Sequence, residues 1–135
     1  MKKIGKYYIT IGLENHVALD TKEKLFSSTK NMFKNNNFSL FDAGMVGVLP
    51  VLSKEPVEMA IAFGLATNSK LNLLSKFDRK HYFYPDLTIG YQITQQFEPI
   101  LTGGVINIKD ENGFDKEVII EHTHLECDAA KSIHN

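Results

Sequence analysis

The chain has 135 residues, which is enough for one domain with a hydrophobic core. Its net charge of −1 excludes a strongly basic protein, so any contact with RNA is expected to be local. A single cysteine cannot form an internal disulfide, and the apolar runs are too short to cross a bilayer. We therefore expect a reducing compartment, either the cytoplasm or an organelle matrix such as that of the mitochondrion.

The first predicted element is a strand from Tyr8 to Leu19. Its odd positions are mostly apolar and its even positions are polar or small, an alternation typical of a half-buried strand. Glu14 and His16 therefore share one face and lie about 7 Å apart along the strand. This spacing suits two ligands of one metal ion, but it fits a solvated polar face of a sheet equally well.

Residues 20–38 are rich in Lys, Asn and Ser, and they predict a loop that ends in a turn at Asn35–Asn37. Within this segment, Ser27 and Ser28 precede Lys30 in the run "LFSSTK". Hydroxyl groups beside a lysine could contact a phosphate, although a capped turn without any ligand is the simpler interpretation.

The best predicted helix lies in residues 53–69 and follows an irregular segment, residues 39–52, with two glycines that permit tight backbone approach. Ser53 is the expected N-cap, and acidic residues follow in the first turns. Helical spacing predicts the following core-facing residues: Val57, Ala60, Ile61, Gly64 and Leu65.

Residues 75–100 carry a cluster of cations and aromatic rings, followed by the strand-like run "GYQIT". The cluster includes Arg79, Lys80 and Tyr82. Basic groups interleaved with aromatic rings can hold phosphates and stack a base or ribose. The alternative is a half-buried strand edge whose cations extend past aromatic packing to reach water.

The C-terminal third predicts a hairpin around the turn "DENG", with a returning strand from Val118 to Glu126. Even positions of this strand and its continuation would share a face: His122, His124, Glu126 and Asp128. Together with the polar face of the first strand, they could bind Mg²⁺, Mn²⁺ or Zn²⁺. A solvated sheet face is again the alternative.

Strands outnumber helices, and the predicted helix lies between strand pairs. This order favours the α+β class, with a mostly antiparallel sheet and few helices, over a doubly wound parallel sheet.

Six ordered blocks connect the chain with a known family: "IGLENH", "KLFSS", "GVLPVL", "KFDRKHYFYPD", "GYQITQ" and "HLECDAAKSIH". From about Ile9 to Ser132, the sequence resembles the N-terminal part of the B subunit of the aspartyl/glutamyl-tRNA amidotransferases. The pair "FDRKHYFYPD" and "GYQITQ" is the most specific part of this resemblance.

The resemblance implies a catalytic domain with a large antiparallel sheet, part of a cradle similar to the glutamine synthetase fold. It implies an activity that uses ATP and Mg²⁺, with Mn²⁺ as a possible substitute, to phosphorylate the side-chain carboxylate of Glu-tRNA(Gln) or Asp-tRNA(Asn). Ammonia released by the A subunit then displaces the phosphate. The implied partners are the A and C subunits of the amidotransferase and the misacylated tRNA, and no membrane is involved.

The resemblance also implies roles for individual residues. Glu14, His16 and Glu126 are the expected metal ligands. Arg79, Lys80 and Tyr82 fall in the block that lines the reaction site and the ammonia channel. Ser27, Ser28 and Lys80 are the candidate ATP-binding residues.

Two hypotheses follow, because residues 1–135 match only a partial catalytic domain, without the helical and tRNA-binding tail domains or a further metal-binding carboxylate. The chain is either a genuine amidotransferase segment, active only with the rest of the enzyme, or a non-catalytic relative that serves as a binding or scaffold piece or represents a truncated reading frame. Departures from the family pattern at Asn15, Ala130 and Cys127 favour the second hypothesis, and the retained site residues favour the first. We expect no transamidation by the isolated chain.

Overall fold

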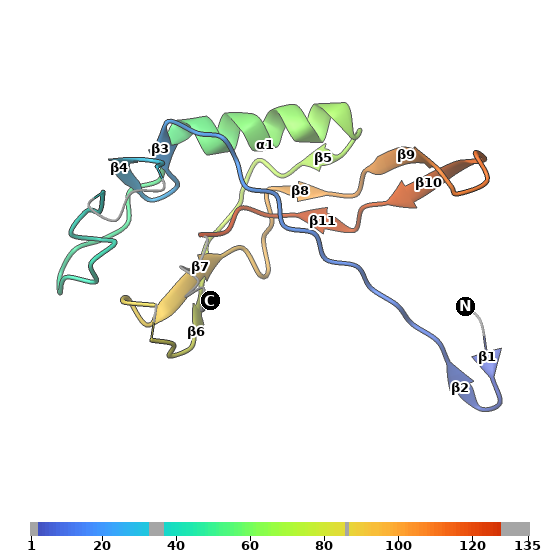
Figure 1. The fold of residues 1–135 in the computed structure, drawn as a ribbon, viewed down its shortest axis with the longest axis horizontal. Helices are drawn as coiled ribbons and strands as arrows, with labels where there is room; N and C mark the ends of the chain where they lie inside the picture. Colours follow the sequence, from blue (N-terminus) through green and yellow to red (C-terminus); the bar gives the residue numbers. More distant parts are fainter. Residues whose placement is uncertain (1–2, 33–36, 86, 128–135) are drawn as a thin grey trace.

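Figure 1 shows the computed structural model of the chain, which describes residues 3–32, 37–85 and 87–127. These residues contain one helix and eleven short strands. In chain order they are β1 (Lys3–Ile4), β2 (Tyr7–Tyr8), β3 (Glu23–Lys24), β4 (Ser27–Lys30), α1 (Lys54–Ala66), β5 (Lys70–Leu71), β6 (Asp78–His81), β7 (Tyr91–Thr94), β8 (Leu101–Thr102), β9 (Val105–Lys109), β10 (Asp115–Ile119) and β11 (His122–Thr123).

Every strand pair within the described residues is antiparallel, so the predicted α+β class is confirmed. The strands form small separate sheets: four hairpins, β1–β2, β3–β4, β6–β7 and β9–β10, and one three-stranded sheet in the order β11–β8–β5. The larger cradle that the family resemblance implies stays a prediction.

Helix α1 begins after Ser53, as predicted, but the Ser53 hydroxyl does not cap it. That hydroxyl donates to the backbone oxygen of Lys24 at 2.7 Å and so ties the start of the helix to β3. The predicted core face is wrong at Leu65, which is exposed because the buried stripe of α1 runs through Pro56, Ala60 and Gly64.

Close packing of α1 on the three-stranded sheet depends on Gly64. A Cβ atom at this position would lie 2.6 Å from Cδ2 of Leu101, a β8 residue that is almost fully buried. The absence of a side chain therefore allows the helix to approach the sheet closely.

The interior has two adjoining clusters of apolar side chains. One contains Ala60, Ile100, Leu101 and Leu125, and the other contains Phe26, Phe41 and Ile93. Leu25 and Phe77 pack against both clusters. The Phe26 and Phe77 rings meet edge to face with centroids 5.1 Å apart, so the clusters form one continuous core.

The predicted strand from Tyr8 to Leu19 is wrong. Residues 9–20 belong to no strand, and we refer to them as the N-terminal strap. The strap leads from the core to the β1–β2 hairpin, which lies away from the other elements in Figure 1. Apolar side chains in the strap, including Ile11 and Leu13, are exposed because no neighbouring strand covers them.

The loop predicted for residues 20–38 is wrong in part, because β3 and β4 pair there. Burial of Phe26 in the core holds this hairpin in place despite its polar composition. The following segment, residues 39–52, is irregular as predicted, with turns at residues 40–44 and 46–47. Asn35 and Asn36 of the predicted turn lie outside the described residues.

The predicted hairpin around "DENG" is confirmed, with five residue pairs joining β9 and β10. Its returning strand does not continue to Glu126, however. β10 ends its pairing with β9 at Ile119, and the chain then pairs with β8 from His122. The change of partner follows because the Gly103–Gly104 link, with positive φ at both residues, separates β8 from β9. Asp128 and Ala130 lie outside the described residues.

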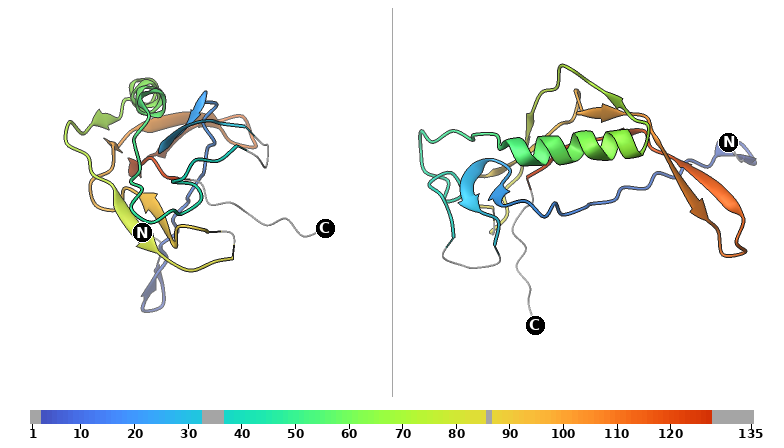
Figure 2. Two further views of the ribbon diagram at one scale, coloured as in Figure 1. Left: turned by 90° about the vertical axis from the view of Figure 1, so that its left-hand side faces the viewer. Right: turned by 90° about the horizontal axis from the view of Figure 1, so that it is seen from above.

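The molecule is open and elongated, as the views in Figure 2 show. Its accessible surface is 11233 Å², compared with about 7,100 Å² for a compact monomer of this mass. No helix in the described part of the chain is long and apolar enough to cross a membrane.

Candidate functional site

Glu126 lies in a short extended segment, residues 124–127, that crosses the end of β7. We call it the Glu126 segment. Leu125 is buried in the core, and the Cys127 amide donates to the Ile93 oxygen at 2.9 Å. Since successive side chains of an extended chain point in opposite directions, the inward side chain of Leu125 leaves Glu126 on the other side.

Two glutamines from β7 and its end hold this segment. Gln92 Nε2 donates to Glu126 Oε1 at 2.8 Å and to the Cys127 oxygen at 2.9 Å. Gln95 Oε1 accepts from the Leu125 amide at 2.9 Å, while its Nε2 donates to Ser75 Oγ at 2.6 Å. The two glutamines are only 8% and 2% exposed, so these bonds form away from water.

The N-terminal strap brings two further side chains to Glu126. His16 Nε2 lies 3.4 Å from Glu14 Oε1, and His16 Nδ1 lies 4.0 Å from Glu126 Oε1. The imidazole therefore lies between two carboxylates that are distant in the sequence. The proximity of Glu14 and His16 agrees with their predicted common face, although the strap is not part of a sheet.

His124 approaches the other carboxylate oxygen, with its Nε2 3.6 Å from Glu126 Oε2. Its ring also stacks on His122, with centroids 5.7 Å apart. The predicted grouping of His122, His124 and Glu126 is thus present, even though they do not form one continuous strand. We use the name Glu126 cluster for five residues: Glu14, His16, Gln92, His124 and Glu126.

Oxygen and imidazole donors of this kind suit Mg²⁺ or Mn²⁺, whose ligands lie roughly 3 Å apart. The two carboxylates, however, approach opposite edges of the His16 ring, so one ion cannot contact all three groups without side-chain rotation. Accordingly, no group of three or more His, Cys, Asp or Glu residues in the described ranges is arranged to hold a metal ion.

The required rotation falls on exposed side chains. Glu14 and His16 are 75% and 71% exposed, whereas Glu126 is 18% exposed. Exposed side chains change rotamer without disturbing a core. The residues present therefore fit a divalent ion in donor chemistry, with Glu126 fixed and the two strap residues free to adjust.

The β6–β7 hairpin separates Arg79 from Lys80. Lys80 pairs with Gln92 across the hairpin, and paired residues share a face, so the Lys80 ammonium lies on the side of the sheet that holds Glu126. Arg79 points to the opposite face, where its guanidinium lies 5.2 Å from the Tyr91 ring centroid. Tyr82 directly follows β6 and is half-buried.

The two candidate ATP-binding serines differ in their surroundings. Ser28 is exposed, whereas Ser27 is buried and its hydroxyl lies 2.7 Å from Thr29 Oγ1. Asp42 completes this group: its Oδ2 accepts from Lys24 Nζ at 3.0 Å and from the Ser39 amide at 2.7 Å. The Ser27 hydroxyl is thus already part of an internal network.

This network lowers the pKa of Asp42. Burial raises the pKa of its carboxyl, but the hydrogen bonds from the Ser39 amide, the Lys24 ammonium and the Ser39 hydroxyl together outweigh burial. The result is a pKa below the ordinary value of 3.8. Asp42 is therefore ionised at neutral pH and holds the β3–β4 hairpin against the turns of residues 39–44.

Gln92, Gln95 and Asp42 were not among the residues that the sequence pattern predicted for the site. The available signal was the presence of three glutamines in the run "GYQITQQ", which is otherwise apolar enough to be a buried strand. Buried amide groups require partners, so this composition indicates a contact, but not with which residue.

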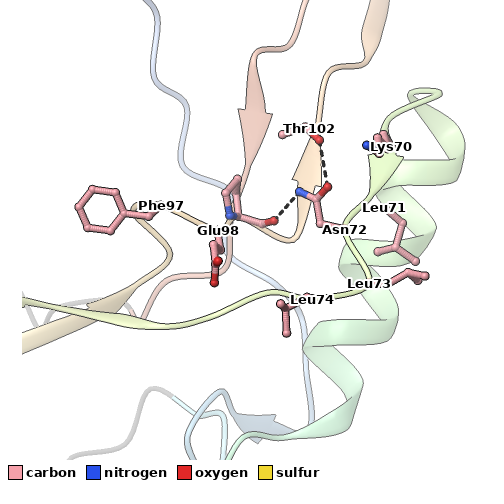
Figure 3. A pocket seen from close by; sticks show the side chains of 9 residues that line it. Lys70, Leu71, Asn72, Leu73, Leu74, Phe97, Glu98 and Thr102 are labelled. Atoms are coloured by element: carbon pink, nitrogen blue, oxygen red, sulfur yellow. Dashed lines mark hydrogen bonds between the residues drawn. The ribbon is translucent and has the colours of Figure 1, made fainter.

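A shallow pocket of about 440 Å³ lies elsewhere, between residues 70–74, residues 97–99 and Thr102 (Figure 3). Asn72 Nδ2 donates to the Pro99 oxygen at 2.8 Å, and Thr102 Oγ1 donates to Asn72 Oδ1 at 3.2 Å. These lining groups bond to each other, and the pocket contains none of the predicted site residues.

Comparison with known proteins defines the family to which the chain belongs. A family model described as the GatB/GatE catalytic domain matches residues 9–135. The chain therefore belongs to this family, and the resemblance that the six sequence blocks indicated is confirmed.

Three relatives are each named as the B subunit of an aspartyl/glutamyl-tRNA(Asn/Gln) amidotransferase. That of Legionella pneumophila (strain Lens) is 52% identical over 93% of this chain, that of Neorickettsia sennetsu is 51% identical over 98%, and that of Rickettsia typhi is 48% identical over 97%. The matched regions are 27%, 27% and 28% of these relatives, so the chain spans little more than a quarter of their length.

Proposed function

We propose that the chain forms part of the B subunit of a tRNA-dependent amidotransferase, which holds ATP and a divalent metal ion during the amidation of Glu-tRNA(Gln) or Asp-tRNA(Asn). Family membership supports this assignment. The observation that carries it is the meeting of Glu14, His16 and Glu126, since these residues come from opposite ends of the matched region and reach one another in the fold.

The reaction brings together two groups that repel, a side-chain carboxylate and a triphosphate. A bound Mg²⁺ would supply charge neutralisation and orientation for both groups. In this chain, Glu126 is a donor held in a fixed position, while Glu14 and His16 are exposed donors that can move onto the ion. Lys80, on the same sheet face as Gln92, adds a cation suited to a phosphate.

The proposed partners are the A and C subunits of the amidotransferase and the misacylated tRNA. The relatives are named as one subunit of an enzyme, which supports a multi-subunit assembly. The large accessible surface of this chain supports contact with further protein, because its exposed apolar side chains include several on the strap and on the β9–β10 hairpin. The glutamine synthetase-like cradle is part of this proposal.

Mn²⁺ binding tests the proposed metal ligands. Titration of the chain with Mn²⁺, followed by the electron paramagnetic resonance signal of the free ion, should show an affinity that falls at least about tenfold in Glu14→Gln and in Glu126→Gln. Glu111→Gln is the matched control, because it removes one exposed carboxylate from the β9–β10 turn. Equal affinities of the wild type and the Glu14 variant would contradict the assignment.

A further inference from the structure

The Glu126 carboxylate, which is only 18% exposed, is held by a neutral group. Its closest hydrogen bond comes from a neutral amide, Gln92 Nε2, at 2.8 Å. A lysine or arginine in this place would orient the carboxylate but would also neutralise its charge. A neutral donor fixes the direction of the carboxylate and leaves its negative charge for a cation.

The geometry dictates the orientation of the Gln92 amide. Glu126 Oε1 and the Cys127 oxygen, which both bond to this side chain, are acceptors, so the nitrogen must face the Glu126 segment. One side chain therefore holds both the carboxylate and the backbone that carries it. Because Gln92 is 8% exposed, loss of these bonds would not be compensated fully by water.

We propose that Gln92 is a positioning residue that holds the Glu126 carboxylate in the direction required for metal binding. This inference rests on the proposed function, because it takes Glu126 to be a metal ligand. Gln92 acts through Glu126 and does not contact the ion itself. Groups that orient metal ligands in this way typically contribute about 10- to 100-fold to metal affinity, by the same mechanism as a carboxylate bonded to a metal-binding histidine.

The opposite assignment, in which Gln92 only stabilises the fold, makes a different prediction. The backbone bond from the Cys127 amide to the Ile93 oxygen and the burial of Leu125 already hold the segment in place. If these two contacts were sufficient to orient Glu126, removal of the Gln92 amide would leave metal affinity unchanged in a folded protein.

The decisive variant is Gln92→Met, which keeps an unbranched side chain of similar length but has no N–H donor. Mn²⁺ alone is the probe, and free Mn²⁺ is measured by electron paramagnetic resonance. We expect the affinity for Mn²⁺ to fall about 10- to 100-fold, with the helical circular dichroism signal unchanged. Thr94→Val is the matched control, because it changes a buried polar residue on the same face of β7 and should leave the affinity unchanged.

The milder variant Gln92→Asn keeps the amide but is one methylene shorter, so it decides the matter if Gln92→Met does not fold. Wild-type affinity in either folded variant overturns the inference but leaves the proposed function intact, provided that Glu126→Gln still weakens Mn²⁺ binding. Equal Mn²⁺ affinity in the wild type and Glu126→Gln overturns both. A loss in both the Gln92 and the Glu126 variants, with Thr94→Val unaffected, supports the proposal.

Discussion

The two halves of the Glu126 cluster are held in very different ways. The Glu126 segment is joined to β7 by a backbone bond and two buried glutamines, and its neighbour Leu125 lies in the core. The N-terminal strap, by contrast, pairs with no strand and exposes both Glu14 and His16. A site built in this way has one fixed donor and two adjustable ones, so a ligand can complete the site by moving the strap alone.

The largest effect that separates the two regions should come from their apolar residues. Leu101 is 1% exposed and packs beneath the Glu126 segment, whereas Leu13 of the strap is 86% exposed. Leu101→Ala should lower the free energy of unfolding by about 3 kcal/mol, because it leaves a cavity in the core. Leu13→Ala should change it by less than about 0.5 kcal/mol.

Urea unfolding followed by the circular dichroism of α1 measures both variants. A loss for Leu13→Ala close to that for Leu101→Ala would show that the strap is packed in solution, which would remove the contrast between the two halves of the cluster.

The next effect concerns Asp42, which fixes the β3–β4 hairpin just after the C-terminal end of the strap. Its pKa is lowered in the folded state, so its contribution to stability is fully present above the unfolded pKa of about 3.9 and is lost as the pH falls through the lower folded value. Asp42→Asn should reduce the free energy of unfolding by about 2 kcal/mol at neutral pH.

The acid sensitivity of the two proteins checks this assignment. The stability of Asp42→Asn should fall less steeply than that of the wild type below about pH 4, because the variant lacks the titrating group. Asp115→Asn is the control: its carboxylate bonds Lys109 at 2.9 Å but is exposed, so its loss should cost less than about 0.5 kcal/mol. Identical pH profiles for the wild type and Asp42→Asn would contradict this assignment.

The contrast between these regions also shows what the sequence could predict. Periodicity identified α1, and the "DENG" turn identified the β9–β10 hairpin, because both signals are local. The strap has the alternation of a strand but no partner, and alternation alone cannot supply one. The β3–β4 hairpin was missed for the opposite reason: its polar sequence suggests a loop, and distant residues such as Asp42 hold it.

The candidate site was predictable to a similar extent. The pairing of Glu14 with His16 followed from spacing, and their proximity to Glu126 followed from the family resemblance. The role of Gln92 could not be predicted, because a hydrogen bond between residues of different segments leaves no spacing pattern. The separation of Arg79 from Lys80 follows from strand geometry, but only once β6 is known to be a strand.

That separation predicts a smaller effect. If ATP phosphates bind on the face that carries Gln92, Lys80→Ala should weaken ATP binding about tenfold, since it removes one charged contact. Arg79→Ala should weaken it less than about threefold, while the lost contact with Tyr91 lowers stability by about 0.5–1 kcal/mol. Equilibrium dialysis with ATP and Mg²⁺ measures both variants, and a larger effect of Arg79→Ala would place the nucleotide on the opposite face.

The smallest effect tests the fixed and adjustable halves directly. Binding of Mn²⁺ should slow amide hydrogen exchange several-fold at residues 14–16 of the strap. These amides exchange through open conformations of the strap, and ion binding makes such conformations rarer. The Cys127 amide, already bonded to the Ile93 oxygen, should change little. Amide exchange rates of both regions, measured with and without Mn²⁺, test this difference. Equal slowing in both regions would mean that the Glu126 segment also closes on the ion, so that neither half of the cluster is fixed beforehand.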